Sequence, residues 1–587
     1  QIWADLVLHN GRVLTLDSEN TEAFTIAEAV AVYDGKIVAV GTDESILRSA
    51  GPSTQKIDLK GKTLIPGLID THSHPQKYAI TQFAPHLARP RISMASKAEA
   101  QLDLKRAVAA KKPGEWIPAT YSVPGGGLGV AVIAYSGELT RADLDAVAPN
   151  NPVLINLSID DNHGLINSKA LELLRAHHPL PFPEGSIRQG PDGSPDGFIK
   201  GNPAFIIHYE LLPRYSPEVL APPFKKQLDE WAAEGVTTLS TRLHGDPISA
   251  YALLDRTGQM PVRIGYSHEI AQGLANPDDI FRRLGNIQGH GTDMLWMIGI
   301  STLNIDGTGS LGWACYHEPY PDHPDFPYWK FKAWGPNGEC NLTDPAFSNR
   351  EIILAANRFG FRISGLHTAG DRAVDTLLDL LEEANKERPI AGRRFAADHV
   401  RFLSREQAER AQKLGLTMFS ISPKNIDREM PVVTALYDSE VAGDVVMPAR
   451  RIIDMGMRLV IEIDTSGRYS FLDIETLVTR KDKNGRIWGP QQRITRNESL
   501  YSFTRWAAEY VLREDVLGSI EKGKWADLVV LDGDFLSVPE DQISDLKVLM
   551  TLVGGKIVYS EPDFARAEGL PQVGFRGPSR VLGRTIE

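Results

Sequence analysis

The stretch IPGLIDTHSHP, residues 65–75, leads from an apolar run into two histidines that are separated by one residue. On an extended strand, side chains two residues apart point to the same face, so His72 and His74 share one side of the strand that the apolar run predicts. Two imidazoles side by side at a strand end are typical of half a metal site. The stretch therefore predicts a strand whose end carries metal ligands.

Short strands and turns flank this stretch at both ends of the chain. DLVLHNGRVLTLD (5–17) and AVAVYDGKIVAVG (29–41) alternate β-branched residues with Gly-containing turns. ADLVVLDGDFLSVP (526–539) and VLMTLVGGKIVYSEP (548–562) repeat the pattern. We therefore expect residues 1–65 and 511–587, the latter including a tail, to form the two parts of one small β-sandwich.

Between the ends, apolar strands alternate with helical stretches, which is typical of a parallel sheet or barrel. The pattern predicts an α/β fold, a (β/α)8 TIM barrel, with its first strand in 66–75 and the rest in 224–510. Residues 76–223 are rich in Pro and Gly and too long for one connection, so they predict an inserted α+β subdomain. The candidate strands span 63–74, 235–245, 261–269, 294–307, 361–370, 393–400, 416–423 and 459–467.

The overall composition favours a small-molecule substrate. The net charge is −12, from 63 basic and 75 acidic residues, and no long basic run is present, which disfavours nucleic acid as a partner. No apolar run approaches the roughly 18 residues of a membrane span. A homodimer stays open. Since the numbering begins at Gln1, a cytoplasmic protein and a periplasmic or secreted one with a cleaved leader are both compatible with the sequence.

The two cysteines, Cys315 and Cys340, lie in no CxxC motif. The sequence therefore predicts neither a disulfide framework nor a structural zinc knuckle. Any metal site has to be built from His, Asp and Glu.

Polar residues that close the predicted strands are the candidates for chemistry, because functional residues of such barrels lie at the C-terminal strand ends. The residues in question are His72, His74, His367, His399 and Asp464. Histidine nitrogens and one carboxylate can hold a divalent ion and leave a position open for water. Asp464 could then take the proton of that water and pass it to the leaving group.

Further residues are candidates for supporting roles. His163, Arg242 and His244 follow predicted strands and are candidate substrate-binding residues, with capping or core roles as the alternative. Trp313 begins a stretch, 313–334, rich in aromatics and prolines. That stretch predicts a lid or pocket wall for an apolar or aromatic substrate; a dimer contact or ordinary packing is the alternative. Asp371 could orient His367 or simply favour the start of a helix, and Asp306 could mark a loop over the site or form a turn.

Several segments, in order along nearly the whole chain, resemble a known family. They are LIPGLIDTHSH, NHGLINSKALELL, GLHTAGDRAVD, ADHVRFLSREQAERAQKLGLTMFSISP, IEIDTSG, GSIEKGKWADLVVLD and TLVGGKIVYSEP. The resemblance is to the amidohydrolase superfamily, in the branch called amidohydrolase family 3, which contains YtcJ-like and N-substituted formamide deformylase-like enzymes. It implies a metal-dependent hydrolase barrel with a composite β-sandwich, and His72, His74, His367, His399 and Asp464 as its metal-site residues.

The resemblance also implies a departure. Members with two ions bridge them with a carboxylated lysine, four residues before the Asp-Gly of a DGS-like motif, and here that motif is LNIDGTGSLG with Thr302 at the lysine position. Threonine cannot be carboxylated. We therefore expect one zinc or similar ion per chain on His72, His74, His367 and Asp464, with His399 a ligand or a donor to the substrate carbonyl. Replacement of the lysine by Glu269 or His268 stays open.

The expected activity is hydrolysis of a non-peptide carbon–nitrogen bond, such as an amide, N-acyl or formamide-type bond, by metal-activated water. A metal-dependent deaminase is an alternative, but such enzymes usually place a glutamate three residues after the histidine of the fifth strand, where this chain has Gly370. Ester or lactone hydrolysis on the same barrel is open too. A catalytically inactive regulatory or binding protein is an alternative of another class, disfavoured by the presence of all five site residues.

Overall fold

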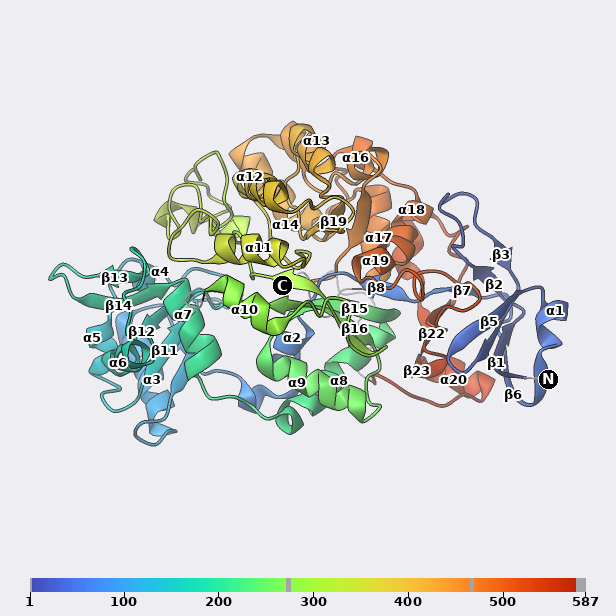
Figure 1. Ribbon diagram of the computed structural model, residues 1–587, viewed down its shortest axis with the longest axis horizontal. Coiled ribbons are helices and arrows are strands. Elements are labelled where there is room, and N and C mark those ends of the chain that lie inside the picture. The colour runs from blue at the N-terminus through green and yellow to red at the C-terminus, as the bar shows by residue number, and fades with distance from the viewer. Residues whose placement is uncertain (1–2, 271–275, 465–468, 577–587) are drawn as a thin grey trace.

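The computed structural model describes residues 3–270, 276–464 and 469–576. Figure 1 shows three regions side by side. Blue and red strands from the two ends of the chain lie at the right. Parallel strands and helices coloured green to orange occupy the centre. The cyan region, which contains strands β9 to β14, lies at the left.

The two ends of the chain share one sheet. It has the order β23-β22-β21-β7-β2-β3, and β7 pairs in parallel with β2 and antiparallel with β21. A second sheet, β5-β4-β1-β6, packs on it through apolar side chains such as Leu6, Val30, Leu528 and Met550. The strands are β1 Ala4–His9, β2 Arg12–Leu14, β3 Ile26–Ala27, β4 Ala29–Tyr33, β5 Lys36–Gly41, β6 Ala50–Asp58, β7 Thr63–Pro66, β21 Leu528–Leu531, β22 Val548–Val553 and β23 Lys556–Ser560.

The region drawn in cyan has its own sheet and core. Its strand order is β13-β14-β12-β11-β10-β9, and helix α3 (Lys97–Ala109) packs on that sheet through Ala100 and Leu104. The strands are β9 Arg91–Ser93, β10 Ile117–Ser122, β11 Val153–Asn156, β12 His163–Ile166, β13 Ile187–Gln189 and β14 Pro195–Lys200. The following helix, α8, spans Pro217–Ala233, so the expected boundary at residue 223 falls inside a helix.

The central strands are parallel and form two sheets. One has the order β17-β16-β15-β8 and the other β18-β19-β20. Their bounds are β8 Leu68–Asp70, β15 Val236–Leu243, β16 Arg263–Glu269, β17 Leu295–Ser301, β18 Ala396–Ala397, β19 Met418–Ile421 and β20 Arg458–Ile461. Residues 465–467 of the last predicted strand lie outside the described part of the chain.

Backbone contacts join the two central sheets at both sides. Between β17 and β18, residues 363–367 make isolated parallel bridges, Ile300 with Ile363 and His367 with Asp398, instead of the full strand expected at 361–370. On the other side, Thr71 N–H donates to Ile461 O at 3.1 Å, which joins the segment after β8 to the end of β20. Seven strands and this bridging segment therefore follow one another as neighbours and lead back to the first.

Helices follow the central strands and bury one apolar face. In α12 (Asp371–Glu387) the buried residues Val374, Leu377, Leu378 and Leu381 recur at the helical spacing that gives one apolar face. The capping box of Ser404 and Gln407 begins α13 (Arg405–Leu414). The other helices of this region include α9 Gly245–Arg256, α10 Pro277–Leu284, α11 Asn349–Arg358, α14 Asn425–Leu436, α17 Ser470–Thr479, α18 Arg496–Ser502 and α19 Arg505–Tyr510.

The two cysteines are paired, so the prediction that they form no disulfide is wrong. Cys315 and Cys340 are joined, with their Cα atoms 5.4 Å apart. Their separation of 25 residues gives no local motif, and only the folded path of the segment between them brings them together.

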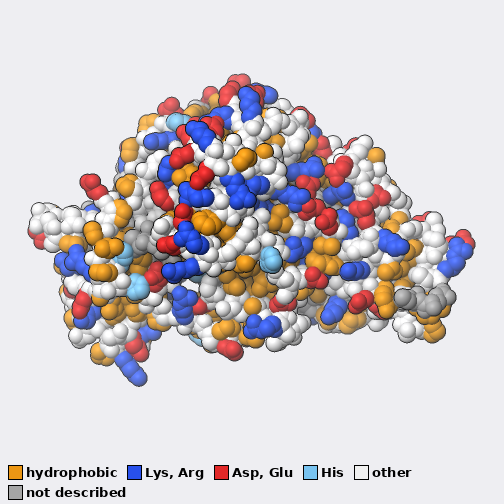
Figure 2. All heavy atoms as spheres, in the orientation of Figure 1, with side chains coloured by type: hydrophobic (Ala, Val, Ile, Leu, Met, Phe, Trp, Pro, Cys, Tyr) orange, Lys and Arg blue, Asp and Glu red, His pale blue; other side chains and the backbone are white. Residues whose placement is uncertain are grey.

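The surface in Figure 2 mixes acidic and basic side chains over the face shown. Among the described residues, no helix has both the length and the apolar character needed to cross a membrane.

Candidate metal centre

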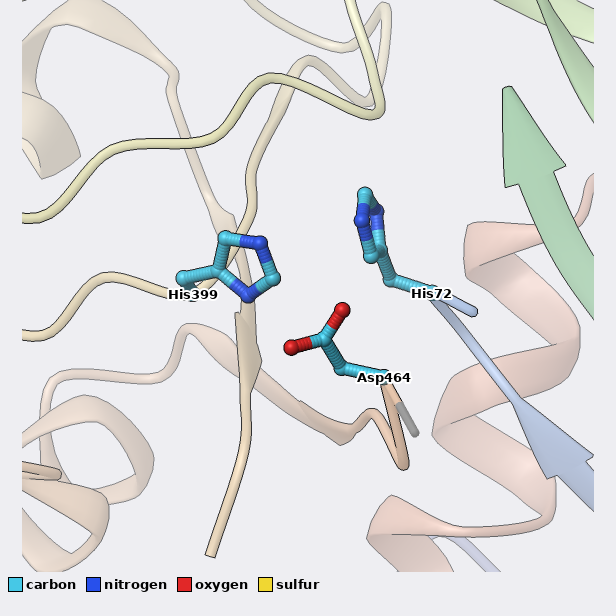
Figure 3. Close-up of side chains that lie close together, drawn as sticks. All are labelled: His72, His399 and Asp464. Carbon is cyan, nitrogen blue, oxygen red and sulfur yellow. The ribbon is translucent and has the colours of Figure 1, made fainter. Parts of the chain in front are cut away.

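The five predicted metal-site residues lie together at the ends of the central strands. His72 Nε2 is 3.2 Å from His74 Nε2, and His74 Nε2 is 3.5 Å from Asp464 Oδ1. The rings of His72 and His399 have centroids 4.7 Å apart, and those of His399 and His367 are 4.5 Å apart. Figure 3 shows the Asp464 carboxylate pointing into the space between His72 and His399. Ligand atoms of these three residues all lie within 4.8 Å of one another.

Three of the histidines have a buried carboxylate at Nδ1. His72 Nδ1 is 2.9 Å from Asp398 Oδ2, and His367 Nδ1 is 3.3 Å from Asp306 Oδ1. His399 Nδ1 makes a short contact with Glu462 Oε1. A carboxylate at Nδ1 fixes the ring and leaves Nε2 free to bind a metal, which is the usual arrangement around metal-bound histidine. The three imidazoles are therefore held as metal ligands would be.

The supporting carboxylates Asp398 and Glu462 were not predicted from the sequence. Asp398 directly precedes His399, and Glu462 lies two residues before Asp464. Their partners are far away along the chain, since Asp398 contacts His72 and Glu462 contacts His399. The only local signals were one acidic residue directly before His399 and one two residues before Asp464. Asp306, in contrast, was singled out, and it takes the role considered for Asp371.

Asp371 has other partners. It accepts a hydrogen bond from the backbone N–H of His317 at 2.9 Å and a short one from the Tyr437 hydroxyl. Asp306 instead accepts the backbone N–H groups of Ala369 and Gly370, at 2.9 and 2.8 Å, besides its contact with His367. The start of α12 is thus anchored to Asp306.

Asp70 ties the strand that carries His72 and His74 to its neighbours. Its carboxylate accepts hydrogen bonds from Ile463 N–H at 2.9 Å and from Trp231 Nε1 at 3.0 Å. The first bond reaches the segment after β20 and the second reaches α8. Because the group is fully buried, its pKa is raised to about 6. This link fixes the end of β8 relative to Asp464.

Two distances within the cluster match the spacing of ligand atoms around a tetrahedral zinc ion. Ligand bonds of about 2.0–2.1 Å at tetrahedral angles place neighbouring ligand atoms about 3.3 Å apart. The contacts of His74 Nε2 with His72 Nε2 at 3.2 Å and with Asp464 Oδ1 at 3.5 Å match that edge length. Burial holds the pKa of His74 and that of His399 well below the usual value, which keeps the imidazoles neutral, as metal binding requires.

Thr302 directly follows β17 and is engaged in hydrogen bonds. Asn349 Nδ2 donates to the Thr302 carbonyl at 2.9 Å and lies 3.3 Å from its hydroxyl. Of the two residues considered as substitutes for the missing lysine, Glu269 accepts a hydrogen bond from the Tyr209 hydroxyl at 2.9 Å and pairs with His244. The lysine that does contact the cluster is Lys424, with Nζ 2.6 Å from Asp464 Oδ2.

The four predicted substrate-binding residues form two separate pairs, each joined by a glutamate. His163 Nε2 and Trp313 Nε1 lie 3.2 and 3.4 Å from the carboxylate of Glu339. His244 Nδ1 is 3.1 Å from Glu269, and Arg242 Nε is 3.8 Å from it. Arg242 also donates to the Leu303 carbonyl at 2.5 Å. The charge of Arg242, in the second pair, contributes to the lowered pKa of His74.

The aromatic stretch 313–334 is packed and does not present its tryptophans to solvent. Trp313 is 1% exposed and stacks on Trp334, with ring centroids 5.3 Å apart, and Trp329 is equally buried. Apolar residues of the cyan region, including Val130, complete this cluster. Of the three alternatives for this stretch, a lid or pocket wall, a dimer contact and ordinary packing, the burial of Trp313 agrees with ordinary packing.

A buried histidine lies near the second pair. The side chain of His208 is 1% exposed, and its Nε2 is 3.7 Å from Asp161 Oδ1. Neither ring nitrogen has a hydrogen-bond partner. Burial lowers the pKa of His208 to about 4, although Asp161 acts in the opposite direction, and the charges of Arg89, Lys77 and His244 lower it further.

His208 should make stability depend on pH. Because its pKa is lower in the folded state than in the unfolded state, the stabilisation is fully present above pH 6.5 and is lost as the pH falls toward 4. Between pH 7 and pH 5 we expect His208 to remove about 2 kcal/mol of the free energy of unfolding. Urea unfolding of wild type and His208→Gln at both pH values measures this, and equal pH dependence in the two proteins would contradict it.

Comparison with known proteins identifies the family. A model of the Amidohydrolase family matches residues 55–559, so the chain belongs to the amidohydrolase family. It is similar to N-substituted formamide deformylase of Arthrobacter pascens, 26% identical over 94% of this chain and 98% of that protein. It is also similar to the putative amidohydrolase YtcJ of Bacillus subtilis, 25% identical over 94% of this chain and 99% of that protein.

A solved structure shares the fold. The chain matches an uncharacterized metal-dependent hydrolase from Pyrococcus horikoshii with a TM-score of 0.60 and 21% identity, over 91% of this chain and 99% of that one. The chain therefore shares its mixed α/β fold with that structure. Family and relatives together make this protein a metal-dependent amidohydrolase.

Proposed function

We propose that this enzyme hydrolyses the carbon–nitrogen bond of a small amide, N-acyl or formamide-type compound with one zinc ion. The observation that carries this proposal is the cluster of His72, His74, His399 and Asp464, with His367 beside it, in which three imidazoles are backed by carboxylates. Such a donor set suits zinc with an open position. The full-length similarity to a formamide deformylase supports the amide substrate.

The ring of neighbouring central strands supports a (β/α)8 barrel as the architecture that carries the site. In that reading the shared sheet of both chain ends belongs to a composite β-sandwich, and the cyan region is an α+β insertion after the first barrel strand. All five metal-site residues then lie at the C-terminal face of the barrel, where catalytic residues of this fold are found. A homodimer stays an expectation.

Each residue of the cluster has a proposed role. His72, His74, His367 and Asp464 hold the ion, and His399 either completes the ligand set or donates to the substrate carbonyl. A bound divalent ion lowers the pKa of water and polarises a carbonyl group. Asp464 accepts the proton of the attacking water and delivers it to the leaving nitrogen. The carbon–nitrogen bond breaks, so the products are a carboxylic acid, or formate, and an amine.

The competing functions are less well supported. A deaminase of this superfamily would need a glutamate three residues after His367, where Gly370 instead serves as a backbone donor to Asp306. Arg242 and His244 are favoured for substrate binding over His163 and Trp313, because the charge of Arg242 acts on His74. An ester or lactone hydrolase would use the same residues, so the choice of bond has to come from assay.

Metal content and amide hydrolysis test this proposal together. We expect about one zinc or similar ion per chain in protein purified without chelators, measured by elemental mass spectrometry. Chelator-treated protein should lose hydrolysis of N-substituted formamides and recover it on adding zinc. Two ions per chain would contradict the single-ion site, and no metal even after zinc addition would overturn the proposal in favour of a binding protein. Hydrolysis of esters without any amide hydrolysis would contradict the amide assignment.

A further inference from the structure

The two carboxylate oxygens of Asp464 have different partners. Oδ1 lies 3.5 Å from His74 Nε2, on the side of the metal ligands. Oδ2 accepts a hydrogen bond from Lys424 Nζ at 2.6 Å. Figure 3 shows the carboxylate of Asp464 directed toward the imidazoles of His72 and His399. One oxygen therefore faces the site and the other is held by an ammonium group.

The backbone of Asp464 is fixed independently of its side chain. Its φ angle is +60°, in the left-handed region that few non-glycine residues adopt. Its N–H donates to the His72 carbonyl at 2.9 Å and lies 3.1 Å from Ser73 Oγ, while its carbonyl accepts from the Tyr78 hydroxyl at 3.0 Å. With the main chain held, rotation of the carboxylate is the freedom that remains, and Lys424 removes it.

Lys424 is itself a buried and oriented residue. It follows β19 and Pro423, immediately before α14, and its side chain is 4% exposed. Burial lowers its pKa to about 8, and the charge of Asp464 opposes that shift. A buried ammonium group that loses its carboxylate partner is strongly destabilised. Lys424 and Asp464 therefore hold each other in place.

We propose that Lys424 is a positioning residue, which holds Oδ2 of Asp464 so that Oδ1 alone is offered to the metal ion. This inference rests on the proposed metal-dependent hydrolase function. A carboxylate that is held in this way binds the ion through one oxygen and cannot chelate it through both. The positive charge of Lys424 also weakens cation binding at the same carboxylate. Lys424 thus lowers the affinity of the site for the metal ion and, in return, fixes Asp464 in an orientation that suits proton transfer.

The test is the substitution Lys424→Met, which removes the charge and the donor but keeps the apolar stem. We expect the Kd for zinc, measured by competition with a chromophoric chelator, to fall by about tenfold. We expect kcat for an N-substituted formamide to fall by about 10- to 100-fold, with KM changed by less than about threefold. A residue that only stabilises the fold would weaken zinc binding or leave it unchanged. Tighter zinc binding together with slower turnover is therefore specific to this role.

Two further variants control the experiment. Lys424→Arg keeps the charge, so zinc Kd should stay near the wild-type value and part of kcat should return. Lys225→Met removes the lysine of another lysine–aspartate pair, with Asp229 on α8, and should change neither value. If Lys424→Met does not fold, Lys424→Gln removes the charge while keeping a donor, and the Kd for zinc should fall in that variant too.

The outcomes separate this inference from the function on which it rests. Wild-type protein that binds zinc and hydrolyses formamides, with unchanged or weaker zinc binding in Lys424→Met or Lys424→Gln, would overturn the role of Lys424 alone. Wild-type protein that binds no zinc would overturn the proposed function and this inference with it.

Discussion

Replacing Asp464 by asparagine is expected to reduce kcat for an N-substituted formamide by about 10³-fold or more, with the fold preserved. Asparagine has nearly the same shape but cannot accept a proton from water, and general acid–base groups contribute about 10²- to 10⁴-fold to turnover. The change also removes the charge that pairs with Lys424 and the one anionic donor that Asp464 contributes to the proposed metal site. Steady-state kinetics with saturating zinc, and circular dichroism of the same samples, measure both expectations.

A matched carboxylate elsewhere controls for the chemistry of the substitution. Asp375→Asn changes a carboxylate on α12 that pairs with His317 and lies outside the metal cluster. It should leave kcat within about twofold of wild type, as expected of a partly exposed pair. Turnover by Asp464→Asn that equals turnover by Asp375→Asn would disprove the proposed mechanism.

Gly370→Ala is expected to lower the free energy of unfolding by about 3 kcal/mol, because the site has no space for a methyl group. A Cβ atom at Gly370 would lie 1.9 Å from the backbone carbonyl oxygen of Cys315, and backbone atoms cannot rotate away. The disulfide-linked segment 315–340 would have to shift. That shift would disturb Asp306, which accepts hydrogen bonds from both Gly370 and Cys315, and through Asp306 the His367 ring.

Chemical denaturation measures the loss in free energy of unfolding of Gly370→Ala. The Kd for zinc of the same variant shows whether the shift reaches His367. Gly190→Ala is the matched control, since its nearest neighbour would be Asp192 Oδ1 at 3.4 Å and its backbone needs no positive φ. We expect the free energy of unfolding of Gly190→Ala to lie within about 0.5 kcal/mol of that of the wild type. Equal stability of the two variants would show that segment 315–340 adapts without cost.

The parts of the site that the sequence predicted are those set by position along a strand. His72, His74, His399 and Asp464 each follow an apolar run, and parallel strands bring such ends to one edge of the sheet. The supporting contacts depend on pairs that are distant in the chain. Asp398 meets His72 across 326 residues and Glu462 meets His399 across 63 residues, so no local pattern could assign them.

Packing decided other questions that the sequence left open. An aromatic loop can form an exposed lid or a buried cluster, and Trp313 is buried because Trp334 and residues of the cyan region such as Val130 supply apolar partners. The segment 361–370 has the composition of a strand, yet its residues contact both neighbours through isolated bridges. Cys315 and Cys340 meet only because their segment folds back on itself.

The sheet shared by both chain ends has a consequence for how the protein is made. Strand β7 has β2 on one side and β21 on the other, and β21 is synthesised more than 450 residues later. One residue beyond β7, Gly67 N–H bonds to the Asp527 carbonyl at 2.8 Å, just before β8 and His72. On the ribosome, β7, which leads directly into β8 and the segment with His72 and His74, therefore waits with one neighbour missing until almost the whole chain has emerged. Such an unpaired edge is open to wrong partners during that time, so the first proposed metal ligands to be translated are among the last to reach their final support.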